Sequence, residues 1–317
     1  MELEKFLNEN NIPFEKDVPL RKLTGMNQAG TIPLVAKPNN IQQLVNLYRV
    51  VNHNFSYEIL GTITNTYIAE GITRDIIIVT TKVKDIEKQE GQVVVGCGYS
   101  LTKIASDLSE EGLTGYEGLV GIPGTVGAAA INNSGAFSSD MAHVVREVQI
   151  INKEGEIHTI SNRDLKYTIR KSCLKHQDFG VLLSVSLQTS EYGDKKEINK
   201  RIKCYKEIRQ KYIDGNRKSL GSIIKGDTVQ RIWEEHPFLS IIRRCIYAPF
   251  KYTKYRKRAQ CFSEFFVLRG LRFYKHCDNI GRFCWSAITT EKDFFDYLAF
   301  IKKVSNNRIT LEIEIKK

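Results

Sequence analysis

The chain has 317 residues, 42% of them hydrophobic, which is enough for two or three compact domains that each bury a core. No apolar run approaches the roughly 18 to 20 residues that cross a bilayer. The first residues, Met1 to Lys5, are acidic and amphipathic, unlike a signal peptide. We therefore expect a globular, cytoplasmic protein.

The seven cysteines include no Cys-x-x-Cys pair. An odd number without a secretion signal is typical of reduced thiols and not of a disulfide framework or a zinc site. We expect no metal.

The net charge of +11 is concentrated in one segment. Between Arg243 and Lys275 ten Lys or Arg residues accompany a single acid, Glu264, so this segment alone carries +9. The rest of the chain is nearly neutral, which argues against nucleic-acid binding by the main body. Aromatic residues alternate with the cations. Three interpretations stay open for residues 243–275: a solvated helical face, peripheral contact with an anionic membrane, or an anchor for a phosphate-rich ligand.

The first part of the chain reads as an α+β module. Hydrophobic periodicity predicts helices at 3–7 and 39–52 and strands at 34–37, 57–61, 75–80 and 92–96. Asn39 or Asn40 is expected to cap the second helix, because a short polar side chain can accept hydrogen bonds from the free amides of the first turn.

The later elements alternate in the same way. We predict a helix over 101–111 that ends at Gly112, a hairpin of strands 144–152 and 157–160, a strand over 180–189, a charged helix over 195–212, a helix over 290–305 and a terminal strand over 309–315. The charged helix is expected to be a connector or a solvated face. In the terminal strand Ile and Leu alternate with polar residues, which include Glu312 and Glu314.

Glycine and alanine dominate residues 112–130. Glycine serves where a backbone turns sharply or where its amides must approach a diphosphate closely. A purely structural, turn-rich segment is the alternative that composition leaves open.

The order of residues in this stretch, with Asn133-Ser134-Gly135-Ala136-Phe137 after it, resembles the signature of the UDP-N-acetylmuramate dehydrogenase (UDP-N-acetylenolpyruvoylglucosamine reductase) family. That family belongs to the vanillyl-alcohol-oxidase-type FAD-binding superfamily. The resemblance implies an α+β chain with a two-subdomain, PCMH-type FAD-binding fold and a C-terminal α+β substrate domain. The expected ranges are 1–98, 99–212 and 213–317.

Three further landmarks follow in the family's order. Residues 165–172 resemble a Tyr-Arg-x-Ser motif, residues 220–225 a Gly-Ser-x-Phe-Lys turn, and residues 311–315 a Leu-Glu-x-Glu-Val strand. The resemblance, which spans about residues 20 to 230 and 286 to 317, makes Arg170, Ser222 and Glu314 the candidate catalytic residues. Arg170 could neutralise the negative charge that develops on the substrate carboxylate, because its planar guanidinium presents several hydrogen-bond donors. Ser222 could donate a proton, and Glu314 could support that donation. Each could instead be structural or solvated.

The implied reaction is reduction of an enolpyruvyl ether on a UDP-amino sugar to the lactyl ether, with FAD and NADPH, for cell-wall or surface-polysaccharide synthesis. The implied partner is therefore a nucleotide sugar. Two alternatives remain: an FAD-dependent oxidase or dehydrogenase of a sugar or alcohol, and a degenerate member of the family that binds without catalysis.

The resemblance also implies the residues that contact FAD. They are Gly61, Thr62, Thr64, Asn65, Gly121, Ile122, Pro123, Gly124, Thr125, Gly127, Ala128, Asn133, Gly135 and Ala136. The family's Gly-Gly-Gly-Ser-Asn turn is altered here, since Thr62 and Ile63 replace two glycines. β-Branched residues disfavour positive φ, so the loop path or the FAD contact is expected to change. Ile169 also stands where the family has Tyr.

Overall fold

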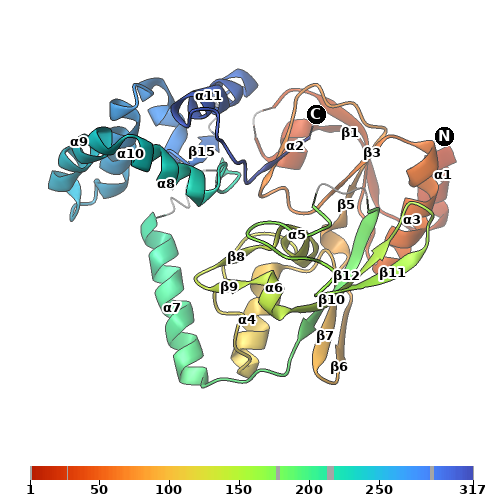
Figure 1. Ribbon diagram of the computed structural model, residues 1–317. Helices are drawn as coiled ribbons and strands as arrows, with labels where there is room; N and C mark the ends of the chain where they lie inside the picture. The colour runs from red at the N-terminus through yellow and green to blue at the C-terminus, as the bar shows by residue number, and fades with distance from the viewer. Residues whose placement is uncertain (1, 27, 176–178, 213–217, 286–288, 317) are drawn as a thin grey trace. The chain divides into compact units, whose positions relative to one another are not determined.

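The computed structural model describes residues 2–26, 28–175, 179–212, 218–285 and 289–316. The chain forms two compact units (Figure 1). Unit 1 comprises Met1–Val18, Ile32–Thr62 and Thr73–Ile208. Unit 2 comprises Pro19–Thr31, Ile63–Ile72 and Arg209–Lys317. The division into 1–98, 99–212 and 213–317 stays a prediction. In the structure, two short N-terminal segments, Pro19–Thr31 and Ile63–Ile72, belong to the same unit as the C-terminal residues.

The first sheet of unit 1 has four strands in the order β1-β2-β5-β3. These strands are β1 Phe14–Pro19, β2 Thr31–Ala36, β5 Ile76–Val79 and β3 Tyr57–Leu60. β2, β5 and β3 run parallel, and the connection between β2 and β3 is helix α3, Ile41–Asn54. Asn40 caps this helix as predicted: its side chain accepts a hydrogen bond from the Gln43 amide at 2.8 Å. Helix α1, Glu2–Glu9, adds Leu3 and Leu7 to the core.

The second sheet of unit 1 is antiparallel, with five strands in the order β11-β10-β12-β7-β6. Its strands are β6 Ile86–Gln89, β7 Gln92–Gly96, β10 Val145–Ile151, β11 Ile157–Ser161 and β12 Val181–Gln188. β10 and β11 form the predicted hairpin. α3 and α5, Val126–Asn132, both pack against β12, whose residues 181–187 are buried. The core of unit 1 thus fills the space between its helices and sheets.

Short elements complete unit 1. They are η1 Thr80–Lys82, α4 Leu101–Glu111, β8 Gly135–Ala136, β9 Ser139–Asp140 and α6 Met141–Val144. α4 has the predicted bounds and ends at Gly112, whose left-handed φ of 98° lets its amide return to the last turn.

Helix α7, Lys195–Tyr212, also has the predicted bounds, but part of its surface is packed and not solvated. Ile198 is fully buried, Arg201 pairs with Glu117, and the Tyr205 ring stacks on Phe137 at 4.3 Å between centroids. These three positions recur every three to four residues, so they lie on one side of the helix. The charged composition of α7 gave no sign of this packed side, because only a few residues of the helix make the contacts.

Unit 2 has its own core, in which aromatic side chains pack among Leu and Ile side chains. Its strands are β4 Thr66–Ile68, β13 Lys218–Ser219, β14 Cys277–Asn279, β15 Arg282–Trp285 and β16 Glu314–Lys316. Its helical elements are α2 Leu20–Thr24, α8 Gly226–Glu235, α9 Pro237–Tyr247, η2 Ala248–Phe250, α10 Arg256–Val267, η3 Leu271–His276 and α11 Glu291–Val304. α9 packs on α10 (Figure 1), and α10 packs on β14. None of the helices described is long and apolar enough to cross a membrane.

The predicted terminal strand over 309–315 is wrong in its length. Regular pairing is limited to β16, which runs parallel to β4, and Leu311 forms an isolated bridge with Ile224. The alternating pattern predicted one continuous strand, but residues 310–312 hydrogen-bond to 223–225 before the chain reaches β4. Strand β4 was missed because three residues give too short a period-2 signal.

Candidate functional site

Helix α5 begins at Val126 within the Gly-rich segment, and Thr125 is its N-cap residue. The Thr125 side chain accepts a hydrogen bond from the Ala128 amide at 3.4 Å, and the Gly127 amide donates to the Cys97 carbonyl at 2.9 Å. A Cβ on Gly127 would lie 2.8 Å from the Cys97 Cβ. This glycine therefore serves close packing between α5 and the end of β7.

Gly121 and Gly124 differ from Gly127. Both have positive φ, 87° and 141°, a backbone that favours glycine. Within the described part of the chain, neither amide donates a hydrogen bond to another residue. Gly121 is exposed and Gly124 half-buried. Two amides that donate to no other described residue, on backbone without side chains, are suited to a phosphate group.

The loop after β3 approaches the same helix start within unit 1. A Cβ on Gly61 would lie 2.8 Å from the Thr125 hydroxyl oxygen, so this glycine is required for the close approach. Thr62 is exposed. Ile63, which replaces a family glycine, has a φ of 55°. The backbone thus keeps a glycine-like conformation at Ile63, although a β-branched side chain disfavours it.

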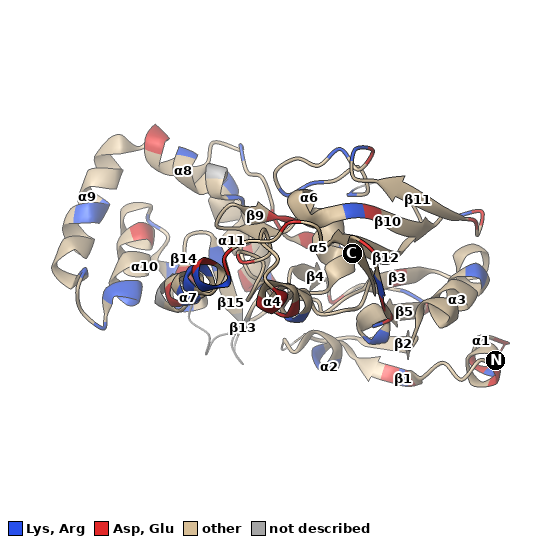
Figure 2. Cartoon of the chain, turned by 90° about the horizontal axis from the view of Figure 1, so that it is seen from below, with Lys and Arg blue, Asp and Glu red and all other residues tan. Residues whose placement is uncertain are grey.

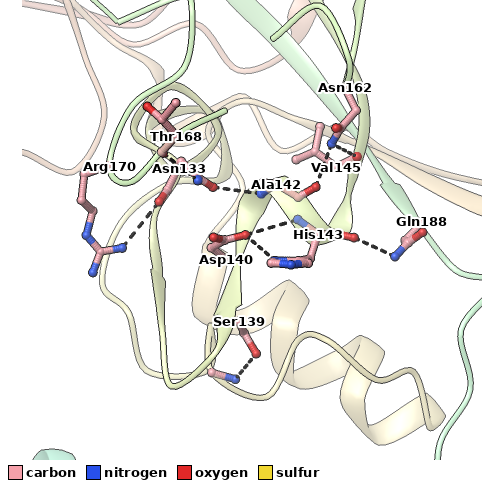
Figure 3. Close-up of polar contacts among 11 residues, drawn as sticks. Asn133, Ser139, Asp140, Ala142, His143, Val145, Asn162, Thr168, Arg170 and Gln188 are labelled. Carbon is pink, nitrogen blue, oxygen red and sulfur yellow. Dashed lines mark hydrogen bonds and ion pairs between the residues drawn. The ribbon is translucent and has the colours of Figure 1, made fainter. Parts of the chain in front are cut away.

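Asn133 joins the Gly-rich segment to the turn that carries Arg170 (Figure 3). Its side-chain amide donates to the Thr168 carbonyl at 3.0 Å, and its side-chain oxygen accepts from the Ala142 amide at 2.9 Å. The side chain is only 4% exposed, so both hydrogen bonds are internal. Its predicted contact with FAD stays a prediction, and the structure adds a positioning role.

Arg170 lies in a tight turn closed by reciprocal backbone hydrogen bonds between Thr168 and Lys171. It has a φ of 57°, and its guanidinium donates to the Asn133 carbonyl at 3.5 Å. The half-buried side chain therefore points toward the end of α5, as Figure 3 shows. Ile169 beside it is 83% exposed, so the residue at the family's Tyr position is not part of the core.

The other two candidate catalytic residues lie in unit 2, where Asn65 ties their backbones together. The Asn65 side chain donates to the carbonyls of Leu220 at 2.9 Å and Ser222 at 3.4 Å. Its own carbonyl accepts from the Glu314 amide at 3.1 Å. A predicted cofactor residue thus holds the turn of Ser222 beside the start of β16.

Both side chains are accessible. Ser222 and Glu314 are exposed, and the Glu314 carboxylate pairs with Lys316 at 2.7 Å. Gly221, with a φ of 72°, makes the turn before Ser222. Arg170 belongs to unit 1, where its guanidinium contacts Asn133. The catalytic roles of the three residues stay predictions.

The remaining candidate cofactor residues divide by exposure. Pro123 and Ala128 are exposed, Ile122, Ala136 and Thr64 are half-buried, and Gly135 is buried. A Cβ on Gly135 would collide with Ser139 and Asp140, so this glycine closes the β8–β9 hairpin.

Glu117 is a residue of the Gly-rich segment to which the sequence assigned no role. Its carboxylate is 4% exposed and accepts from Arg201 at 2.5 Å, from the Thr114 hydroxyl at 3.0 Å and from the Gly115 amide at 2.8 Å. Burial raises the pKa of Glu117, but these hydrogen bonds outweigh it and hold the pKa below its usual range. A lone acid in an apolar, Gly-rich stretch was the available signal.

Comparison with known proteins defines the class. Residues 32–161 match the model of an FAD binding domain. The UDP-N-acetylenolpyruvylglucosamine reductase of Thermus caldophilus has the same fold, with a TM-score of 0.67 at 21% identity, over 96% of this chain and 100% of that one. The chain is therefore an α+β protein with a PCMH-type FAD-binding fold, as expected.

Two curated relatives name the family. The UDP-N-acetylenolpyruvoylglucosamine reductase of Caldicellulosiruptor saccharolyticus is 30% identical over 71% of this chain and 73% of its own length. That of Anoxybacillus flavithermus is 28% identical over 72% and 76%. The chain belongs to the UDP-N-acetylenolpyruvoylglucosamine reductase family.

Proposed function

We propose that the chain is a flavin-dependent reductase that uses NADPH to convert an enolpyruvyl ether of a UDP-amino sugar to the lactyl ether, for cell-wall or surface-polysaccharide synthesis. Membership of the reductase family is the observation that carries this proposal. It is supported by an Arg, a Ser and a Glu at the positions that the family's motifs indicate.

The residues of unit 1 fit the cofactor. The amides of Gly121 and Gly124 would hold the diphosphate, and Gly61 brings its loop close to Thr125. When bound, FAD supplies the hydride chemistry, which no side chain can provide. The chain's own residues must therefore bind and orient the substrate and move a proton.

Arg170 would bind the substrate carboxylate through two parallel hydrogen bonds and so stabilise negative charge that develops there. Ser222 would donate its hydroxyl proton to the neighbouring carbon. Glu314, whose carboxylate is paired with Lys316, would orient that hydroxyl or restore its proton. Asn65 would keep the two elements in register, since it hydrogen-bonds to the backbones of both.

The absorbance spectrum of the purified protein tests the cofactor and the reaction. We expect flavin absorbance bands in the blue region of the visible spectrum. NADPH should bleach these bands, and UDP-N-acetylglucosamine enolpyruvate should restore them. Bleaching only by other alcohols or sugars would instead favour the oxidase. A colourless protein that cannot take up added FAD would favour a binding role without catalysis.

Ser222→Ala tests the proton donor. Loss of a general acid costs about 10²- to 10⁴-fold in rate, so bleaching by NADPH should persist while sugar reduction slows by that factor. Ser219→Ala, three residues earlier in the same segment, is the matched control and should keep normal turnover. Full activity of Ser222→Ala would remove this serine from the mechanism.

A further inference from the structure

A stretch of unit 2 exposes large apolar side chains together with cations. Of twelve large hydrophobic residues that are exposed within the described chain, eight lie between 238 and 271. We name these eight the basic aromatic surface: Phe238, Ile241, Phe250, Tyr252, Tyr255, Phe262, Phe266 and Leu271. So many exposed apolar residues within one stretch of sequence are more than the scattered single ones of an ordinary protein surface.

Helix α9 places part of this surface along one side. Phe238, Ile241 and Cys245 are exposed and are three and four residues apart, so they lie on one face. Phe238 is 71% exposed and Ile241 58%. After α9, η2 and the turns that follow expose Phe250 and Tyr252, the latter to 91%. The most exposed apolar groups therefore lie on α9 and on the turns after it.

The exposed charges of residues 243–275 are all positive. Its single acid, Glu264, is 3% exposed and lies 3.5 Å from Arg243, so it does not offset the outer cations. Lys251 and Lys254 are exposed, and their ammonium groups lie over the Tyr252 and Tyr255 rings at 5.3 and 5.2 Å. Figure 2 shows Lys and Arg on both α9 and α10.

Not all of the segment is surface. Cys261, Phe265 and Phe273 are buried in the core of unit 2 and hold the helices in place. The exposed apolar groups are thus displayed on an ordered support and are not loose ends of a chain. Of the three interpretations that the sequence leaves open for residues 243–275, this arrangement favours contact with an interface.

We propose that the basic aromatic surface docks on an anionic lipid surface, with α9 in the plane of the interface. α9 has eleven residues, about 16 Å, too short to span a bilayer but suited to lie along it. Phe238, Ile241 and Tyr252 enter the boundary between headgroups and acyl chains. Lys251, Lys254 and Arg244 remain at the level of the lipid phosphates.

The same features disfavour two other occupants. A second copy of this surface would bring like charges together without an exposed acid between 237 and 275 to pair with them. A nucleic acid would use the cations and the aromatic rings, but Ile241 and Leu271 offer no stacking face. An anionic lipid interface accommodates the cations, the rings and the aliphatic groups alike.

Sedimentation of the full chain with lipid vesicles tests the proposal. We expect affinity for phosphatidylcholine vesicles with about one third phosphatidylglycerol to exceed that for pure phosphatidylcholine by at least roughly tenfold, and to fall in high salt. Equal affinity for the two vesicles, or no sedimentation with either, would overturn the proposal.

Two variants separate the contributions. Phe238→Ser with Tyr252→Ser should reduce binding to acidic vesicles by roughly tenfold or more, because apolar area no longer leaves water. Lys251→Gln with Lys254→Gln should reduce it similarly at low salt and less at high salt. All four side chains are exposed, so the fold is expected to persist, which circular dichroism verifies.

Matched controls lie in unit 1. Tyr192→Ser removes a ring that is 69% exposed, and Lys82→Gln with Lys84→Gln removes two exposed cations. Vesicle binding should be unchanged in these controls. An equal loss in controls and test variants would overturn the proposed surface. So would self-association or RNA binding that the test variants abolish while vesicle binding stays normal.

Discussion

The Gly-rich segment and the loop at Gly61 to Ile63 both lie at predicted FAD contacts, yet they follow different rules. In the segment, Gly127 stands where a side chain would collide with Cys97, and it is retained. In the loop, Ile63 has a φ of 55°. This left-handed conformation is unfavourable for a β-branched residue, yet the position accepts the side chain. The difference teaches that glycines required by packing and glycines required by conformation tolerate replacement differently.

The physical reason is the size of each penalty. A Cβ at 2.8 Å from another carbon requires whole elements to move, because α5 and the end of β7 are both in the core. A left-handed β-branched residue costs on the order of 1–3 kcal/mol, which a stable unit can tolerate.

Gly127→Ala is the sharpest test of this comparison and should have the largest effect. The added Cβ meets Cys97, so unfolding free energy should fall by about 3 kcal/mol, measured by urea denaturation. Gly71→Ala is the control, since nothing lies within 4 Å of a Cβ at Gly71. Equal effects of the two substitutions would break the distinction between packed and open glycines.

Glu117→Gln asks whether side chains as well as glycines hold the Gly-rich segment. Loss of the charge that Arg201, Thr114 and Gly115 stabilise should cost about 2 kcal/mol near neutral pH.

The direction of the pKa shift of Glu117 determines how its contribution to stability changes with pH. The pKa of Glu117 is lower in the folded chain, so its contribution is present above the unfolded value of about 4.3 and is lost as pH falls through the folded pKa. Parent and variant should therefore converge in acid. A difference that stays constant at low pH would assign the effect to packing alone.

Ile63→Gly should have the smallest effect and the opposite sign. Relief of the left-handed conformation outweighs the added freedom of the unfolded chain, so stability should rise by about 0.5–1 kcal/mol. FAD affinity, measured by fluorescence titration, should rise or stay unchanged. Ile63→Val retains β-branching and should match the parent. If Ile63→Gly is instead destabilised by more than Ile63→Val, packing of the Ile63 side chain matters more than its backbone.

Much of the fold was predictable from local patterns. The bounds of α4 and α7 agree because each has a clear periodicity and, for α4, a glycine stop. The short strand β4 and the division of residues 310–316 between two partners were missed, because their partners are remote along the chain.

For the candidate site, the motifs located Arg170, Ser222 and Glu314, but not the residues that hold them. The expected contact of Asn133 with FAD stays a prediction, and the structure shows in addition that its side chain spans from Ala142 to Thr168. The order of motifs along the sequence does not indicate which side chains make hydrogen bonds within the protein.

The sequence by itself determined the family, the cofactor class and five of the eleven α-helices described, because motif order and hydrophobic period are local properties of the chain. Only the tertiary structure decided which glycines serve packing, that Arg201 satisfies a carboxylate 84 residues earlier, and that residues 63–72 pack with the C-terminal unit. These depend on steric and electrostatic contacts between distant segments, which exist only once the chain has folded.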